Sequence, residues 1–429
     1  MTRFFPAAAI ADRQRGLLKE AYVVFYLMCL ATVSIGICAS FVVPLPKQYA
    51  VAVGLALPTL LFRSLVQLNQ SVNRSGNLMR RFNTIESMHA ILGLVLSLAA
   101  LRLFGNGPEA IIIGLLAAAV ICSSCDIRLL ASPFRRNAGV LDRTELLRLV
   151  EYAWPLVSVA ATAVILQTSD RFMLGSLAGP EMLGIFAVAY SLVERPTTLI
   201  CSSVSTATFP YVVQVLEHKG REAARLQAGR NGIALLALML PTCAGLALTA
   251  EYIAGSLVGS EFRPGVAALL PIMSFTALAR GVRSHFIDHA FHLSGQPLRM
   301  LWTYGPAMVV NIALNIYVVP RYGMFGAAWT AFVCQAGTVI GGWFLGRTLF
   351  PIWLPIGQVV RCALAIVPMI AALSLIHFSI SWTGLAAAIS LGGTVYAIGA
   401  IALDVGDVKS IICDALRRRV NPKMPALSD

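Results

Sequence analysis

Residues 323–346 read GMFGAAWTAFVCQAGTVIGGWFLG, a run of 24 residues without one charged side chain. A helix of roughly 20 apolar residues is long enough to cross the hydrocarbon core of a bilayer. The run is also rich in glycine and alanine, which allow membrane helices to approach one another closely. This stretch therefore predicts a transmembrane helix that packs tightly against its neighbours.

The same pattern extends over most of the chain. Of the 429 residues, 58% are hydrophobic and 12% are charged, whereas a soluble protein carries about 25% charged residues. This composition excludes a soluble enzyme, a nucleic-acid-binding protein, a disordered protein and a single-span receptor. It predicts an all-α polytopic membrane protein of about 12 transmembrane helices. The twelve apolar segments are 21–43, 49–68, 86–104, 108–126, 152–174, 182–209, 231–257, 265–286, 298–319, 323–346, 357–377 and 382–403.

The loops between these segments alternate in charge. Basic residues gather in the N-terminal tail, in the second, fourth and sixth loops and in the C-terminal tail, and the odd loops are nearly bare. The sixth loop, for example, contains Lys219, Arg221, Arg225 and Arg230. Because positively charged loops stay in the cytoplasm, the sequence predicts a multi-pass membrane protein with both termini cytoplasmic.

The main internal boundary is predicted at the basic loop 127–151. Asp142 and Glu145 are spaced there like a capping box, which starts a helix. The predicted parts are a cytoplasmic tail (1–20), an N-terminal lobe of four spans (21–126), a cytoplasmic linker with an interfacial helix (127–151), a C-terminal lobe of six spans (152–346), an extra helix pair (347–403) and a basic cytoplasmic tail (404–429).

Charged side chains inside the predicted spans are the candidate functional residues. An ionisable group costs about 2.5 kcal/mol or more in a span, so it usually faces a polar cavity. The excess is basic, and it includes Arg63, Arg195, Arg280 and Arg283. Arginine binds phosphate bidentately and keeps its charge when desolvated. These residues therefore predict a cationic cavity for an anionic, phosphate-bearing ligand.

Other roles for these arginines stay open. Arg63 and Arg283 could extend to the inner headgroups instead, and Arg195 could neutralise its neighbour Glu194. Among the acidic residues in the spans, Glu194 and Asp170 are the candidates for ion coupling, and Glu194 is the stronger candidate for a protonation site.

Catalytic and cofactor motifs are missing from the sequence. His285, Asp288, His289 and His292 have the spacing of one helical face, as metal ligands could have, but the chain contains only six histidines. A polar helix end at the inner surface explains this cluster better. There is also no phosphate-binding loop and no nucleophile elbow. We expect no enzymatic activity, no metal site and no cofactor.

Two stretches resemble a known family. Residues 169–175, SDRFMLG, and residues 311–323, NIALNIYVVPRYG, followed by Gly326-Ala-Ala, are similar to bacterial polysaccharide flippases of the Wzx type. These belong to the multidrug/oligosaccharidyl-lipid/polysaccharide flippase superfamily. The resemblance implies two helix lobes around a central cavity that opens alternately to each side. It implies undecaprenyl-diphosphate-linked oligosaccharides as substrates, moved from the inner to the outer leaflet with ion coupling.

The chain departs from the family in one respect. By this resemblance its spans match the family's third to fourteenth helices, so the first two helices would be lacking. Whether the N-terminus is truncated or the chain is a shortened member stays open at this stage.

The sequence thus predicts a transporter that flips an O-antigen or exopolysaccharide repeat unit. The alternatives within the superfamily are a peptidoglycan-precursor flippase and a drug or cation antiporter, although the basic cavity argues against the antiporter. A non-transporting component of a polysaccharide assembly complex is an alternative of another class, and the short outer loops argue against a polymerase or ligase. Expected partners are the lipid-linked anionic oligosaccharide, membrane lipids and polysaccharide polymerase or export machinery, with no nucleic acid. The sugar, the coupling ion, the oligomeric state and the organism do not follow from the sequence.

Overall fold

The computed structural model describes residues 22–34, 47–75, 78–105, 107–126, 143–407 and 409. Within these ranges the chain is helical and contains no strand, which confirms the predicted all-α class. Eleven of the twelve predicted apolar segments lie on helices. The first, 21–43, is helical from Tyr22 to Ser34, and its second half lies outside the described residues. The predicted N-terminal tail, most of the predicted linker and most of the predicted C-terminal tail lie outside them too.

Residues 1–151 form the first of two compact units. Its helices are residues 22–34, α3 (Lys47–Ser75), α4 (Met79–Phe104) and α5 (Pro108–Cys125), and α7 (Arg143–Leu177) begins in it. Helix α5 packs against both α3 and α4. The approach to α4 depends on Gly114, because a Cβ atom at this position would lie 2.3 Å from the backbone nitrogen of Ser97. Small residues thus bring these two helices together, as is common in membranes.

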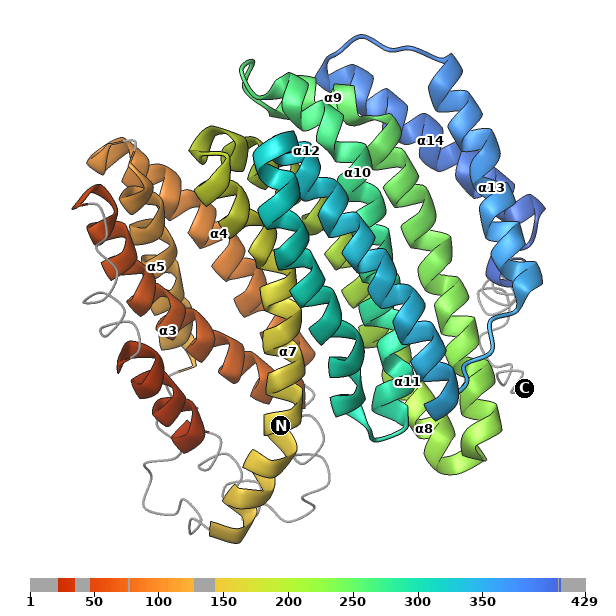
Figure 1. Cartoon of the computed structure of the whole chain (residues 1–429), viewed down its shortest axis with the longest axis horizontal. Helices are drawn as coiled ribbons and strands as arrows, with labels where there is room; N and C mark the ends of the chain where they lie inside the picture. Colours follow the sequence, from red (N-terminus) through yellow and green to blue (C-terminus); the bar gives the residue numbers. More distant parts are fainter. Residues whose placement is uncertain are drawn as a thin grey trace. The chain divides into compact units, whose positions relative to one another are not determined.

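Residues 152–429 form the second unit. Helix α10 packs against α8 and α12, and α13 packs against α14 and α8. After α7, the elements in chain order are α8 (Pro180–Leu248), α9 (Ala250–Leu257), α10 (Arg263–Val282), the π-helix η2 (Arg283–Ile287), α11 (Asp288–Leu293), η3 (Pro297–Met300), α12 (Leu301–Leu349), α13 (Ile356–Leu375), α14 (Trp382–Ala402) and η4 (Val405–Asp407) (Figure 1).

Two glycines divide the longest helices of this unit. Gly220 in α8 has a φ of 83° and Gly323 in α12 has a φ of 55°. Glycine adopts these left-handed conformations readily, whereas other residues are strained there. The chain turns at both breaks (Figure 1). Each helix therefore provides two lengths of membrane-spanning size, as the separate apolar segments predicted.

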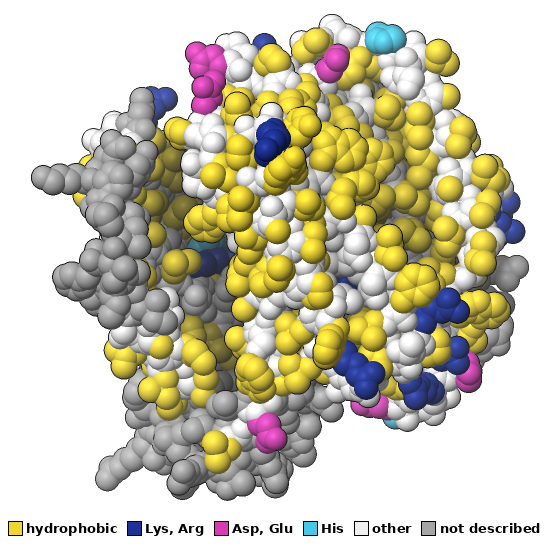
Figure 2. Space-filling model, viewed as in Figure 1, with side chains coloured by type: hydrophobic (Ala, Val, Ile, Leu, Met, Phe, Trp, Pro, Cys, Tyr) yellow, Lys and Arg dark blue, Asp and Glu magenta, His cyan; other side chains and the backbone are white. Residues whose placement is uncertain are grey.

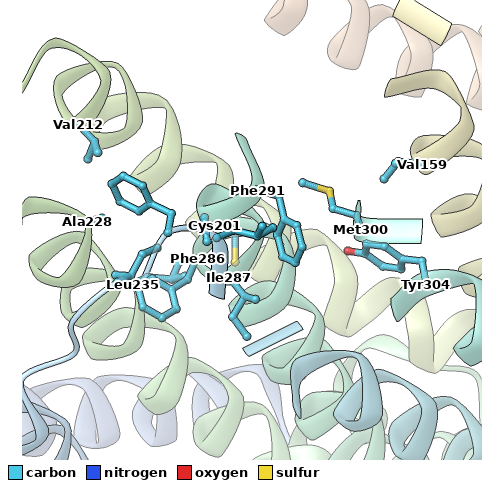
Figure 3. Packing of buried hydrophobic residues seen from close by; sticks show 14 of the residues in the cluster. Val159, Cys201, Val212, Ala228, Leu235, Phe286, Ile287, Phe291, Met300 and Tyr304 are labelled. Carbon is cyan, nitrogen blue, oxygen red and sulfur yellow. The ribbon is translucent and has the colours of Figure 1, made fainter. Parts of the chain in front are cut away.

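The core of the second unit is built mainly from aromatic and aliphatic side chains. Phe286 and Ile287 of η2 and Phe291 of α11 pack with Leu235 of α8 and Tyr304 of α12 (Figure 3). These side chains come from four elements, so the short segment after α10 joins the helices around it. That segment also contains charged residues, and its position in the core matters for the site below.

The outer surface of the helices is strongly apolar. Seven of the described helices are long and apolar enough to cross a membrane, among them α8 and α12. Large side chains such as Leu103, Phe172, Trp302 and Leu375 are more than 75% exposed, and hydrophobic side chains cover most of the described surface in Figure 2. Exposed apolar surface on this scale needs lipid around it. The protein is a multi-pass membrane protein.

Candidate functional site

A small polar pocket lies inside the second unit, between α7, α8, α10 and α12. Its polar lining includes Asp170, Tyr190, Arg280, Asn311 and Gln335. The cavity measures ≈ 30 Å³, which is room for about two water molecules. Polar side chains from four helices thus meet where the surrounding residues are apolar.

A second, wider pocket adjoins the first. It measures ≈ 170 Å³ and shares Gln167, Ala277 and Arg280 with the first pocket. Its further polar lining includes Glu194 and His285. The guanidinium of Arg280 therefore lies where the two pockets meet.

Arg280 is held by two partners on α8. It forms an ion pair with Glu194, and its Nη1 donates a hydrogen bond to the hydroxyl of Tyr190 at 2.9 Å. Thr198 donates to Oε1 of the same glutamate at 2.9 Å. The side chains of Arg280 and Glu194 are only 13% and 25% exposed, so little water competes for the pair. Breaking such a pair leaves an uncompensated charge, which is costly.

The ring of Tyr190 contacts a second cation, Arg171, beside Arg280. The guanidinium carbon of Arg171 lies 3.9 Å from the centre of the Tyr190 ring, and that of Arg280 lies 5.3 Å from it. Both distances are within the range of a cation–π interaction. Two guanidinium groups therefore share one ring, and the carboxylates of Glu194 and Asp170 lie in the same pair of pockets.

Asp170 lies in the first pocket among amides. Its side chain is buried, and its Oδ1 accepts hydrogen bonds from Nδ2 of Asn311 at 2.9 Å and Nδ2 of Asn315 at 2.8 Å. Ser169 donates to Oδ1 of Asn311 at 2.7 Å. The two asparagines stand four residues apart on α12, on one face of the helix. Helix α12 thus presents two amides to one carboxylate of α7.

Arg283 lies elsewhere, in the core. It is 0% exposed, pairs with Asp288 at 2.6 Å and donates to Thr303 at 2.7 Å. Tyr304 completes the network by donating to Asp288 at 2.8 Å. The guanidinium packs over Gly342, where a Cβ atom would lie 2.3 Å from Nη1. These contacts favour a structural role over ligand binding.

The other two predicted arginines lie outside both pockets. Arg195 is exposed on α8, one residue after Glu194 and therefore rotated by about 100° around the helix axis. Arg63 belongs to the first unit, where it pairs with Glu86 at 2.8 Å. The structure thus brings Arg280, Glu194 and Asp170 together and places Arg195 and Arg283 apart from them, whereas Arg63 belongs to the other unit.

The sequence matches the model of one protein family. The model of the polysaccharide biosynthesis protein family matches residues 21–267, more than half of the chain. The chain belongs to the polysaccharide biosynthesis protein family. A search of curated proteins finds no match.

Solved structures agree on the fold. The chain is similar to the structure described as "Lipid II flippase MurJ, inward closed conformation", with a TM-score of 0.72 and 16% sequence identity. The match covers 94% of this chain and 87% of the other. The resemblance to polysaccharide flippases seen in the sequence is therefore confirmed, and the helices follow a flippase fold.

The sequence alone does not identify several residues of this site. Tyr190, Thr198 and Gln335 are uncharged, so the cost of a charge inside a membrane span does not mark them as functional residues. Arg171 is an ionisable residue inside a predicted span, but only the structure shows that its guanidinium lies over the Tyr190 ring. The paired asparagines belong to the stretch NIALNIYVVPRYG, and their role in holding Asp170 follows only from the contact of α12 with α7.

The histidine cluster makes separate contacts. Nδ1 of His285 is hydrogen-bonded to Oγ of Ser205 at 2.8 Å, and the ring of His289 lies 4.3 Å from that of Phe209. Across the described residues, no group of three His, Cys, Asp or Glu side chains is arranged to hold a metal ion.

Proposed function

We propose that this protein is a flippase for an undecaprenyl-diphosphate-linked oligosaccharide, such as an O-antigen or exopolysaccharide repeat unit. The observation that carries the proposal is the ion pair of Arg280 and Glu194 between two polar pockets, in a chain with a flippase fold. The membership of the polysaccharide biosynthesis family supports a polysaccharide precursor as the substrate. Transport runs from the inner to the outer leaflet of the inner membrane by alternating access.

Arg280 is the proposed diphosphate-binding residue of this unit. A diphosphate offers several oxygen atoms in the geometry that a guanidinium binds best. When it binds, it competes with Glu194 for Arg280, and Arg171 is a second cation at the Tyr190 ring. Arg63 and Arg195 line neither pocket, and for them phosphate binding stays a prediction from the sequence. Arg283 is left out, because its charge is already satisfied by Asp288.

Asp170 is the proposed coupling site, and Glu194 responds to it through Arg280. A buried carboxylate surrounded by amide and hydroxyl groups can hold a proton or a sodium ion, since amide and hydroxyl oxygens are ligands that hard cations accept. The two asparagines can turn their amide oxygens toward such an ion. Binding of the cation then changes the contact of α7 with α12, and this change is the proposed link to transport.

A second candidate has its own support. The similar structure is described as a lipid II flippase, and lipid II is also a diphosphate-linked lipid. A peptidoglycan-precursor flippase is therefore the alternative within the same chemistry.

Complementation separates these candidates. The chain is expressed in one bacterium that lacks its O-antigen or exopolysaccharide flippase and in another that lacks its lipid II flippase. We expect surface polysaccharide to return in the first strain and no growth rescue in the second. The opposite result would assign the chain to peptidoglycan precursors. A well-inserted protein that rescues neither strain would contradict the proposed function.

A further inference from the structure

A wide groove lies on the second unit, away from the polar pockets. It is formed by the end of α12, the segment 350–355, the start of α13 and the part of α8 that follows Gly220, and it measures ≈ 430 Å³. Its lining is mainly apolar, from Trp343 to Val359, with Arg225 and Arg347 as its charged members. None of its residues lines either polar pocket. It is therefore a separate feature of the surface.

The wall of the groove is fixed by arginines of α8. Nε of Arg225 donates to the carbonyl of Pro351 at 2.6 Å, and Arg221 donates to the carbonyl of Leu349. At Gly229, a Cβ atom would lie 1.9 Å from the carbonyl oxygen of Trp353. The backbone of 349–353 is thus held against α8, so the groove exists before any ligand binds.

The charge of Arg347 and one nitrogen of Arg225 are available to an anion at the groove. Arg347 is exposed and makes no hydrogen bond or ion pair with the described residues. Arg225 uses Nε for Pro351 and Nη1 for Glu222 at 2.7 Å, which leaves Nη2 outside both contacts. Lys and Arg side chains gather over this end of α8 and α12 in Figure 2. An acidic group placed here would meet two guanidinium groups.

The groove lies at the level where a headgroup is expected. The turn of α8 beside it contains the basic residues that predict a cytoplasmic loop. Trp343 and Trp353 line it, and Trp353 is 66% exposed. Tryptophan is enriched at the boundary of hydrocarbon and headgroups. Ile356, 77% exposed, continues the apolar lining toward α13.

We propose that this groove binds an acidic phospholipid of the inner leaflet. The phosphate lies against Arg347 and Arg225, and an acyl chain follows Trp353, Ile356 and Val359. A zwitterionic lipid would bring its own positive charge to the same two arginines, so charge favours a net-negative headgroup. The groove shares no residue with the proposed diphosphate site, and this proposal does not depend on the proposed function.

The test is a lipid titration of the full chain. Protein purified in detergent is titrated with phosphatidylglycerol and, separately, with phosphatidylcholine, and retained lipid is counted by native mass spectrometry. We expect phosphatidylglycerol to be retained preferentially. Arg347→Gln should weaken this retention about fivefold, the factor for ~1 kcal/mol per basic residue at an anionic surface. Arg321→Gln is the matched control, since Arg321 is exposed and bonds only within its own helix turn, at Tyr317.

Placement is tested by tryptophan fluorescence in nanodiscs. A small fraction of phosphatidylglycerol with brominated acyl chains should quench the protein, and Trp353→Phe should remove most of the quenching that depends on Arg347. Equal retention of both lipids, or an unchanged Arg347→Gln variant, would overturn the proposal. Displacement of phosphatidylglycerol by undecaprenyl diphosphate at one-to-one stoichiometry would also overturn it, because the groove would then belong to the transported lipid.

Discussion

Arg280 contacts a carboxylate, a phenol and two pockets with a single guanidinium group. Its partner Glu194 is adjacent in sequence to Arg195, yet only the first of these two faces the pocket, because neighbouring residues on a helix point about 100° apart. A charged residue far inside a predicted span can be identified as a candidate from the sequence. They do not distinguish the member of the pair that lines the site.

Replacement of Arg280 tests the proposed diphosphate contact. Arg280→Gln removes a charge-assisted interaction of about 1.5–3 kcal/mol, so transport should fall roughly tenfold or more. Arg280→Lys should recover only part of it, because lysine lacks the bidentate fork. Surface polysaccharide in the complemented strain is the measurement, with protein level in the membrane checked for each variant. Wild-type export by Arg280→Gln would contradict the assignment, and Arg321→Gln serves as the unaffected control.

Asp170→Asn tests ion coupling. The substitution keeps the size of the side chain and removes its charge, so the protein should still fold, since an amide can bond with Asn311 and Asn315. Transport into inverted vesicles should no longer respond to an imposed proton or sodium gradient. Glu181→Gln, at an exposed carboxylate in the first turn of α8, should respond as the wild type does. A full gradient response in Asp170→Asn would exclude Asp170 as the coupling site.

At the scale of elements, most of the fold could be predicted, because each helix is specified by a long apolar run. The glycine break in α8 lies in a predicted loop, and the break in α12 lies at the first residue of the predicted span 323–346. The candidate site was harder to predict. Arg280 and Arg283 stand three residues apart, and the sequence predicts one cationic cavity for both. Arg283 instead packs over Gly342 of α12, and the sequence of α10 alone does not indicate which neighbour offers that space.

The contact of α5 with α4 gives a prediction about stability. Gly114→Ala places a methyl group against the backbone of Ser97, and backbone cannot move aside as a flexible side chain can. We expect a loss of about 1–3 kcal/mol in the free energy of unfolding, as for other overpacked interiors. Thermal unfolding in detergent measures it.

Gly54→Ala is the matched control for this substitution. A Cβ atom there meets nothing within 4 Å, so its midpoint temperature should equal or exceed that of the wild type, because alanine favours helix over glycine. If Gly114→Ala is as stable as Gly54→Ala, the close packing of α5 on α4 does not support the first unit.

At the scale of the whole molecule, the orientation in the membrane connects the basic loops to the proposed direction of transport. The break at Gly220 lies in a loop with Lys219 and Arg221, and the break at Gly323 follows a single arginine. Three span-length segments separate the two breaks: the rest of α8, α10 with the segment that follows it, and the first part of α12. The two breaks therefore lie on opposite sides of the membrane, and the break at Gly220 is the inner one if both termini are cytoplasmic.

We therefore expect alkaline phosphatase fused after Glu222 to be inactive and the same reporter fused after Arg321 to be active, since this enzyme matures only outside the cytoplasm. A fluorescent protein that matures in the cytoplasm should give the reverse pattern at the two positions. If the fusion after Glu222 is the active one, the basic groove faces the outer leaflet, and Arg280 receives its ligand from the opposite side to the one proposed.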